Sequence, residues 1–503
     1  DDAMGETAVS VVVRVRPPLA HEAPYGHCAR AEGRRVFLNM SGEPSVVPGE
    51  AERSKVVECD YDSVLDMRTT QEDVWQNVRP TVDKVFEGYN ATFFTYGMTG
   101  SGKTFTMLGP KLMSAAFEGE RVPSPQELRE CKLRGVVPRV IEHIFDRLPQ
   151  NGANSAHVSL SYLQIYRERC YDLLRPAAAA GPLKIREEGG SSGRQPQAYV
   201  EGLTEVPVQT VEACFQKLVY GFANIAFRAT NYNEQSSRSH SVFTITIQQQ
   251  GAVPGIVRQS KIRLVDLAGN ERWETFGPRM SQVHTKELTS INQSLSTLGT
   301  CIQALSAPAQ VSKKDGRRIE QHVPYRNSAL TMLLRDSLSG NSYTKMLCTV
   351  CSCALYQVQT LCTLRFADRA KRVKMKARVT DVIDPKTLLK QTQAEVEYLR
   401  SLVAGGGMTA EVRQQLEDLE RKREELEGEN RSLKEQMAEL AAQISLSQTG
   451  NLTAHMDRLA ATARGGLRLS LGASANLGDL GAVQWLAHQG GLEASMAAAA
   501  QPW

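Results

Sequence analysis

The segment GMTGSGKT, residues Gly97–Thr104, holds the residue types that bind a triphosphate and fits the pattern G-x-x-x-x-G-K-[ST]. Glycines let successive backbone N–H groups point at phosphate oxygens, while a lysine reaches the β- and γ-phosphates. The hydroxyl of Thr104 is suited to Mg²⁺. The apolar run Ala91–Gly97 before the motif predicts a buried strand, and TFTML after it predicts the start of a helix. This context argues against a chance match in a Gly/Ser loop.

Two later segments carry groups that could respond to a γ-phosphate. In NEQSSRSH (Asn233–His240) the hydroxyls of Ser236 and Ser237 could reach the phosphate, its Mg²⁺ or an attacking water. In DLAGNE (Asp266–Glu271) the sequence offers an acidic residue for a Mg²⁺-bound water and a glycine N–H for the phosphate. Arg238 and Glu271 are an arginine fork and a carboxylate that could pair. The alternative for this pair is two solvated surface charges.

The elements that must position these groups can be read from apolar patterning. VSVVVRV, SVFTITIQQQ and KIRLVDLAG predict strands, the last ending at Asp266, and INQSLSTLGTCIQAL predicts a helix. KMLCTVCSCAL predicts a buried strand, so Cys348, Cys351 and Cys353 are interpreted as core thiols rather than metal ligands. The segment KLMSAAFEGERVPSPQEL is interpreted as a lengthened surface loop.

With these motifs in this order, the chain resembles a kinesin motor domain. Further blocks follow the order of that family from about residue 8 to 375, among them VVVRVRPPL, SYLQIYRERCYDLL, HVPYRNSALTMLLRDSLSGN and TLRFADRAKRVK. The resemblance implies an α/β P-loop fold, with a central mixed sheet flanked by helices on both faces and an α-helical coiled coil after it. A GTPase is disfavoured because no N-K-x-D segment is present.

The resemblance also implies roles for individual residues, with ATP/ADP and Mg²⁺ as cofactors. The residues expected to bind the nucleotide are Arg14, Arg16, Pro17, Gly97, Met98, Thr99, Gly100, Ser101, Gly102, Lys103, Thr104 and Phe105. Those expected to hold the metal are Thr104, Ser237 and Asp266. Those expected to act in hydrolysis are Asn233, Ser236, Ser237, Arg238, Gly269 and Glu271, with an Arg238–Glu271 ion pair closing over the water. No general base is expected, because positioning and charge stabilisation dominate phosphoryl transfer.

Composition limits the function classes. The 503 residues carry a net charge of only +4, so the whole chain is no polycation and no nucleic-acid partner is expected. No run of apolar residues reaches membrane-spanning length, and no signal peptide is recognised, so no membrane insertion is expected. The ten cysteines are scattered and are expected to be free thiols.

Cations that could face an acidic microtubule surface are expected in two loops and around VPYR. By resemblance they are Arg272, Arg279, Lys313, Lys314, Arg317, Arg318, His322 and Arg326. The alternative is an ordinary solvated charged loop. Ala329 and Met332 stand where relatives usually carry cations, and RWETFGPRM follows DLAGNE where small and basic residues are more usual. Ile225 replaces an arginine and Asn270 replaces a serine.

The chain changes character beyond the motor. We expect a flexible N-terminus at 1–7, a motor domain at 8–375, an extended neck linker at 376–385 and a neck helix at 386–404. Residues 409–447 carry a heptad pattern with Asn430 at an a position, which predicts a homodimeric coiled coil. A single helix packing on the motor is the alternative. Residues 448–503 resemble a low-complexity tail, from which no cargo can be read.

Together these features predict an ATP-driven microtubule motor, plus-end directed by resemblance, in the cytoplasm on the cytoskeleton, with a cilium or spindle as candidate sites. One alternative is a kinesin-like microtubule-binding anchor with weak or no motility. Another is a dimeric scaffold in which the coiled coil is the working part.

Overall fold

The computed structural model describes the chain in segments, listed here by residue number: 7–40, 55–117, 120–148, 156–176, 181–188, 197–231, 238–250, 256–271, 282–307, 310–311, 318–319, 322–383, 421, 424, 427–428, 431 and 435. The chain divides into two compact units, Asp1–Thr387 and Leu388–Trp503. The described residues of the second unit are all helical. The predicted coiled coil falls almost entirely outside the described residues and stays a prediction.

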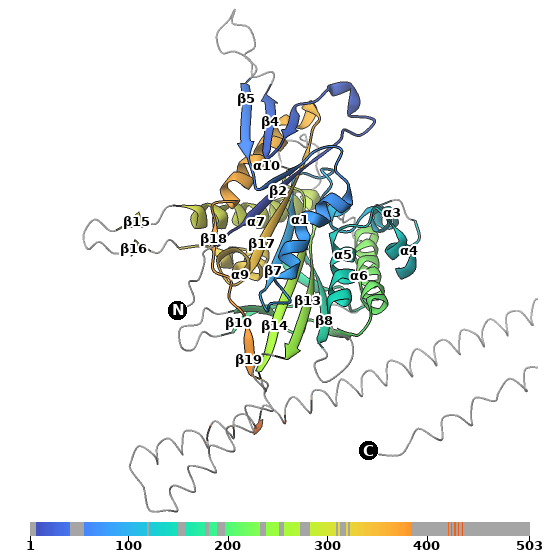
Figure 1. Cartoon of the computed structure of the whole chain (residues 1–503), viewed down its shortest axis with the longest axis vertical. Coiled ribbons are helices and arrows are strands. Elements are labelled where there is room, and N and C mark those ends of the chain that lie inside the picture. The colour runs from blue at the N-terminus through green and yellow to red at the C-terminus, as the bar shows by residue number, and fades with distance from the viewer. Residues whose placement is uncertain are drawn as a thin grey trace, which may run out of the picture. The chain divides into compact units, whose positions relative to one another are not determined.

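A ten-stranded mixed sheet runs through the first unit (Figure 1). Its order is β12 (Val206–Val208), β8 (His157–Tyr166), β13 (His240–Gln250), β14 (Ile256–Asp266), β7 (Ala91–Tyr96), β17 (Tyr343–Cys351), β2 (Ser10–Arg16) and β6 (Ser63–Leu65). β9 (Arg169–Asp172) and β19 (Asp381–Ile383) pair with β8 and β14 outside this path. The strands from β14 to β6 are parallel to their neighbours, whereas β12, β8, β13 and β14 pair antiparallel. The expected mixed sheet is confirmed.

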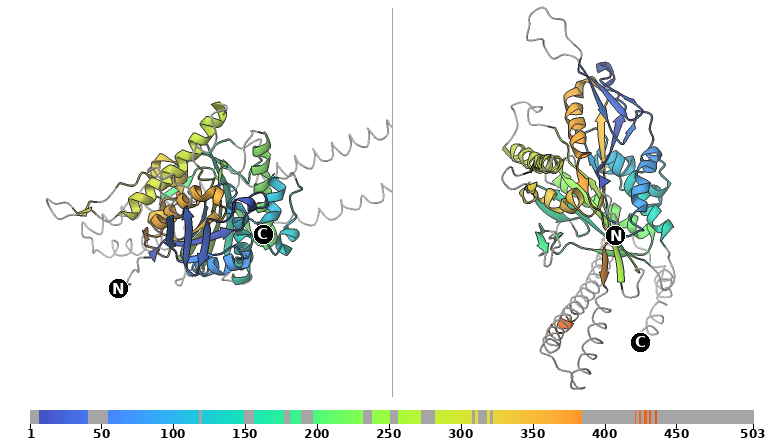
Figure 2. Two further views of the ribbon diagram at one scale, coloured as in Figure 1. Left: turned by 90° about the horizontal axis from the view of Figure 1, so that it is seen from above. Right: turned by 60° about the vertical axis from the view of Figure 1, so that its left-hand side comes forward.

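Alternating side chains divide the core into two layers, one on each face of the sheet. On β2, Val11 and Val13 belong to one buried cluster and Val12 to the other. The first cluster is covered by α7 (Gln282–Ser306), α8 (Ala329–Leu333), α9 (Arg335–Ser339) and α10 (Gln357–Ala370). The second is covered by α1 (Gln71–Asp83), α2 (Lys103–Met107), α3 (Pro110–Phe117), α4 (Pro125–Glu130), α5 (Val136–Arg147) and α6 (Val211–Asn231). Figure 2 shows α7 and α10 on the opposite side of the sheet from α1.

The remaining elements are small. A separate three-stranded sheet consists of β3 (Ala29–Glu32), β4 (Arg35–Met40) and β5 (Lys55–Asp60). There are also three two-stranded ladders in the described residues. They join β10 (Ile185–Glu188) to β11 (Gln197–Val200), β15 (Gln310–Val311) to β16 (Arg318–Ile319), and β1 (Thr7–Ala8) to β18 (Lys374–Met375). Short 3-10 turns cover Ala23–Tyr25, Tyr325–Asn327 and Ala354–Tyr356. The strand predicted at VSVVVRV is β2, which the two-residue strand β1 precedes.

The segment interpreted as a surface loop contains α3 and α4, so that prediction was wrong. Leu112 and Leu128 explain the difference, because both side chains are buried in the second core layer. Ser124 also caps α4, accepting a hydrogen bond from the N–H of Glu127, while the Glu127 side chain accepts one from the N–H of Ser124. This capping box is visible in the sequence as S-x-x-E.

The end of the first unit lies along the sheet. β19 pairs antiparallel with Ile256–Arg258 of β14, and the N–H of Gln259 donates to the carbonyl of Thr380 (2.9 Å). The side chain of Asn341 contacts the same segment, since its Nδ2 donates to the hydroxyl of Thr380 (3.1 Å). An extended segment at 376–385 was expected, and the described part of it, 376–383, is docked in this structure.

Two further observations bear on composition. All ten cysteines are free. Cys348 and Cys351 in β17 and Cys353 just after it are fully buried, as the interpretation as core thiols requires. Among the helices in the described segments, none combines the length and apolarity needed to cross a bilayer.

Candidate nucleotide site

The predicted phosphate loop connects β7 to α2. All six residues of β7 are buried between β14 and β17, and the loop leaves the carboxyl end of the strand. That edge of parallel strands is where α/β folds bind ligands. At Gly97 an added Cβ would collide with the backbone oxygen of Thr349, so only glycine allows this close approach. The strand–loop–helix arrangement of Gly97–Phe105 is confirmed.

Lys103 is the buried cation of this loop. Its Nζ donates to the carbonyls of Gly97 (3.0 Å) and Met98 (2.9 Å), and burial lowers its pKa, although Asp266 and Glu271 oppose this. A buried ammonium that is hydrogen-bonded only to neutral carbonyls is stabilised by an incoming anion. The residues present therefore fit a triphosphate.

A hydroxyl and a carboxylate meet beside the loop, where the sequence predicted metal ligands. Asp266, the last residue of β14, accepts hydrogen bonds from the hydroxyls of Thr104 (2.6 Å) and Thr95 (2.8 Å). Burial raises the pKa of Asp266, while Thr104, Lys103 and Thr95 counteract the rise. These are the hard oxygen ligands that Mg²⁺ prefers, so the pair fits that ion. Thr95 was missed; its place opposite Asp266 follows from the β14–β7 register.

On the other side of the loop, Arg14 and Phe105 lie together as a base-binding pair would require. The Arg14 guanidinium lies over the Phe105 ring, 5.4 Å from its centre, and also donates to Gln71 (2.9 Å) and Thr106 (2.8 Å). Burial lowers the pKa of Arg14 to about 10. Gln71 and Thr106 were missed, because nothing in their local sequence marks them.

Arg16 connects the same loop to a buried carboxylate. Its Nε donates to the carbonyl of Gly100 (2.7 Å), and its two terminal nitrogens bind Glu22 at 2.6 Å each. The hydrogen bond from Arg16 lowers the pKa of Glu22 to about 2. Pro17 offers its carbonyl to the same guanidinium (2.8 Å). Arg16 therefore contacts the loop and Pro17 contacts Arg16, while their expected role in binding the nucleotide stays a prediction; Glu22 is a partner that sequence reasoning missed.

The second switch segment closes directly onto the phosphate loop. Both carboxylate oxygens of Glu271 accept hydrogen bonds from Thr99, one from its N–H (2.9 Å) and one from its hydroxyl. An added Cβ at Gly269 would collide with these same groups. The expected ion pair between Glu271 and Arg238 stays a prediction. Asn233, Ser236 and Ser237 lie outside the described residues.

His240, the last residue of the NEQSSRSH segment, is buried, and the sequence motifs predict no function for it. Its Nδ1 accepts a hydrogen bond from the N–H of Ala268 (3.0 Å), and its Nε2 lies 2.8 Å from the hydroxyl of Ser294 on α7. Burial and the nearby Lys103 lower the pKa of His240 to about 3. The imidazole is therefore neutral at physiological pH.

Of the eight residues expected to bind the microtubule, the structure describes three, which are Arg318, His322 and Arg326. Arg326 is exposed and forms an ion pair with Glu187 of β10, which also pairs with Arg335 (3.4 Å). His322 is exposed, and Arg318 lies in β16. The predicted residues Arg272, Arg279, Lys313, Lys314 and Arg317 lie outside the described residues.

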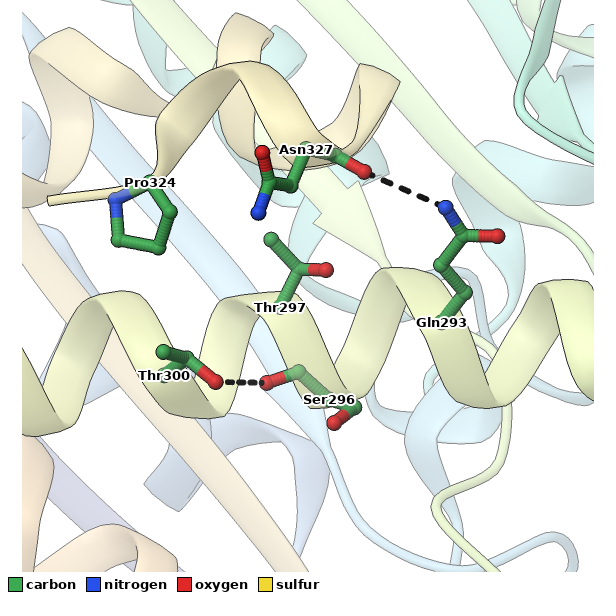
Figure 3. Close-up of a pocket in the computed structure, with 6 residues that line it drawn as sticks. All are labelled: Gln293, Ser296, Thr297, Thr300, Pro324 and Asn327. Carbon is green, nitrogen blue, oxygen red and sulfur yellow. Dashed lines mark hydrogen bonds between the residues drawn. The ribbon is translucent and has the colours of Figure 1, made fainter.

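Two clefts lie beside Asn327, on the side of the first unit that is expected to bind microtubules and is called the outward face below. One, of about 150 Å³, lies between α7 and the Tyr325–Asn327 turn and is lined by Gln293, Ser296, Thr297, Thr300, Pro324 and Asn327 (Figure 3). The other, of about 490 Å³, is lined in part by Ala329, Met332, Lys184 and Arg186. The side chains on α8 at this cleft, Ala329 and Met332, carry no charge.

Comparisons with known proteins agree with this geometry. The kinesin motor domain family model matches residues 14–373. The kinesin-like protein KIN-12B of Oryza sativa subsp. japonica is 38% identical over 413 residues, covering 78% of this chain and 34% of that protein. The kinesin heavy chain of Gibberella moniliformis is 35% identical over 404 residues, covering 79% and 38%. This chain thus spans little more than a third of the length of these relatives.

Solved structures give the same result. A fast kinesin is similar with a TM-score of 0.60 and 36% identity, covering 75% of this chain and 95% of that one. A KIF14 dimer in a two-heads-bound state with AMP-PNP, in complex with a microtubule, has a TM-score of 0.60 and 33% identity, covering 75% and 97%. The family model matches residues 14–373, and the two relatives are at least 35% identical over more than three quarters of the chain, so the chain belongs to the kinesin motor domain family.

Proposed function

We propose that this chain is an ATP-driven microtubule motor. The observation that carries the proposal is the meeting of Lys103, the Thr104–Asp266 pair and the Thr99–Glu271 contact at the carboxyl ends of neighbouring parallel strands. Lys103 and the loop N–H groups would bind the phosphates of ATP, and Arg14 with Phe105 would border the base. Thr104, Asp266 and Ser237 would hold Mg²⁺, which would neutralise phosphate charge when bound.

Hydrolysis would depend on positioning rather than on a general base. Gly269 would offer its N–H to the γ-phosphate, and Arg238 with Glu271 would enclose the attacking water, helped by Asn233 and Ser236. In this structure Glu271 accepts hydrogen bonds from the N–H and the hydroxyl of Thr99, which already places its carboxylate beside the phosphate loop.

The coupling to movement would pass through residues 376–385. Docking of β19 on β14 supports the proposal that this segment alternates between docked and released positions with the nucleotide state. Plus-end direction is proposed from the place of the motor before this segment. Residues 409–447 would join two chains into a homodimer, and microtubules would place the protein on the cytoskeleton in the cytoplasm.

A second candidate is a kinesin-like anchor that binds microtubules with weak or no motility. The observations that favour it are the uncharged side chains of Ala329 and Met332, which line the larger cleft, and the pairing of Arg326 with Glu187. A scaffold that works through its coiled coil is a third reading, with no described contact in its favour.

The test is the steady-state ATPase rate of the full chain, titrated with taxol-stabilised microtubules, with Lys103→Ala as the inactive control. Strong activation that Lys103→Ala abolishes is the result expected for the motor. Tight nucleotide binding with a low rate that microtubules leave unchanged would contradict the motor and support the anchor. A Lys103→Ala chain that still performed the protein's role in cells would support the scaffold.

A further inference from the structure

His240 is a buried group that the proposed hydrolysis does not use. Its side chain lies at the start of β13 and is 3% exposed. It bridges two other elements, the loop that follows β14 through Ala268 and the helix α7 through Ser294. Three segments that are distant in sequence are therefore joined by one imidazole.

The two hydrogen bonds of His240 determine the tautomer of its imidazole ring. Because Nδ1 accepts from a backbone N–H, it carries no proton, and Nε2–H must donate to the hydroxyl of Ser294. A neutral imidazole with both nitrogens engaged and the ring buried has little freedom to rotate. It can thus transmit a displacement from one neighbour to the other.

The two neighbours lie at functionally different places. Ala268 precedes Gly269, whose N–H would bind the γ-phosphate in the proposed function. On α7, Ser294 is 2% exposed and points inward, whereas Gln293 and Ser296 on either side of it line the outward cleft (Figure 3). The cleft also contains Asn327, whose carbonyl accepts a hydrogen bond from Gln293 (3.4 Å).

We propose that His240 is a positioning residue that transmits movement of the Gly269 loop to α7 and so changes the outward face with the nucleotide state. The inference rests on the proposed function, because its consequence is a different microtubule affinity for different nucleotides. A coupling of this kind is measured as a ratio of two affinities.

The experiment compares the full wild-type chain with Ser294→Ala, His240→Asn and the double variant. Ser294→Ala removes the hydroxyl that contacts Nε2 of His240 and leaves the hydrogen bond between His240 and Ala268 in place, and asparagine can keep an acceptor for Ala268 while failing to reach Ser294. The quantity measured is the dissociation constant for microtubules in ADP divided by that in AMP-PNP. Each single variant is expected to lower this ratio about fivefold, the scale of one buried hydrogen bond. The double variant should lower it no further, and the KM for ATP should change less than the ratio.

Ser337→Ala is the matched control. Ser337 is a fully buried serine on α9 whose hydroxyl is hydrogen-bonded to Thr92 of β7 (2.8 Å), away from His240. Its loss should lower thermal stability as Ser294→Ala does and leave the affinity ratio unchanged.

The outcomes separate the two proposals. If the microtubule affinity of the wild-type chain is the same in ADP and in AMP-PNP, the proposed function is contradicted. A wild-type ratio that Ser294→Ala retains would overturn only the role of His240, and so would an equal loss in Ser337→Ala. If His240→Asn fails to fold, Ser294→Ala alone decides.

Discussion

The nucleotide site and the outward face of α8 hold their charged groups in different ways. At the nucleotide site Glu22 is 1% exposed and Lys103 6% exposed, and each makes at least two hydrogen bonds. At the outward face the Arg326 side chain is 74% exposed and pairs with Glu187. Buried polar groups must be satisfied by the fold, whereas exposed charges are satisfied by water at little cost. We therefore expect substitutions of these buried groups to disturb the nucleotide site, and substitutions of the exposed charges to change the proposed microtubule affinity at little cost in stability.

The largest effect is expected from Lys103→Ala. Removing the buried cation should lower nucleotide affinity by about 10²–10³-fold, on the scale of deleting one preorganised charge contact to a phosphate. Equilibrium titration with a fluorescent ADP analogue measures it. Wild-type affinity in this variant would mean that the phosphates bind elsewhere.

The next largest effect is expected from adding positive charge at the two uncharged side chains of α8 that line the larger cleft. The double substitution Ala329→Lys and Met332→Arg should tighten microtubule binding about tenfold at low salt, because exposed cations attract an acidic surface over about a Debye length. Co-sedimentation at rising KCl measures it, and the gain should shrink with salt. Gln76→Lys with Gln126→Lys, on the exposed sides of α1 and α4, adds the same charge on the opposite face. An equal gain in that control would show that only net charge matters.

A smaller effect concerns the Arg16–Glu22 pair and has a defined pH dependence. The pKa of Glu22 is about 2 in the folded chain and 4.5 in its ordinary state, so the stabilisation is complete above pH 4.5 and is lost as pH falls towards 2. Glu22→Gln should cost about 1–2 kcal/mol at pH 7, since desolvation offsets part of the ion pair. Urea unfolding at several pH values measures the difference between the two chains, which should narrow between pH 4.5 and 3. A difference that stays constant over that range would show that the charge of Glu22 does not contribute.

The smallest effect is expected from Glu187→Gln at the ion pair with Arg326. Thermal stability should fall by no more than about 1 kcal/mol, because the arginine of this pair is 74% exposed although the Glu187 side chain is 15% exposed. Microtubule affinity should rise about two- to threefold at low salt, since Arg326 would lose the carboxylate with which it pairs. The same co-sedimentation assay measures it. Weaker binding would instead mean that Glu187 holds Arg326 in its binding position.

Local patterns predicted the parts of the fold that depend on local sequence. Strand β7, the loop Gly97–Gly102 and the start of α2 follow from an apolar run, glycines and a helix start, and all three are confirmed. The segment around α3 and α4 was misread because polar and small residues outnumber Leu112 and Leu128, whose burial becomes visible only when the helices pack on α6 and its neighbours. Helix α7 begins at Gln282, nine residues before its predicted first residue, Ile291, because the periodic apolar pattern starts later than the helix does.

The sequence by itself determined which chemical groups this protein has: a glycine-rich loop with its lysine, a hydroxyl and a carboxylate suited to a metal ion, and two segments whose groups are proposed to sense a γ-phosphate. Only the tertiary structure decided which of them touch. Glu271 accepts hydrogen bonds from Thr99 across 172 positions, and His240 joins Ala268 to Ser294. The reason is that strand register and helix packing set these distances, and neither is encoded within one short motif.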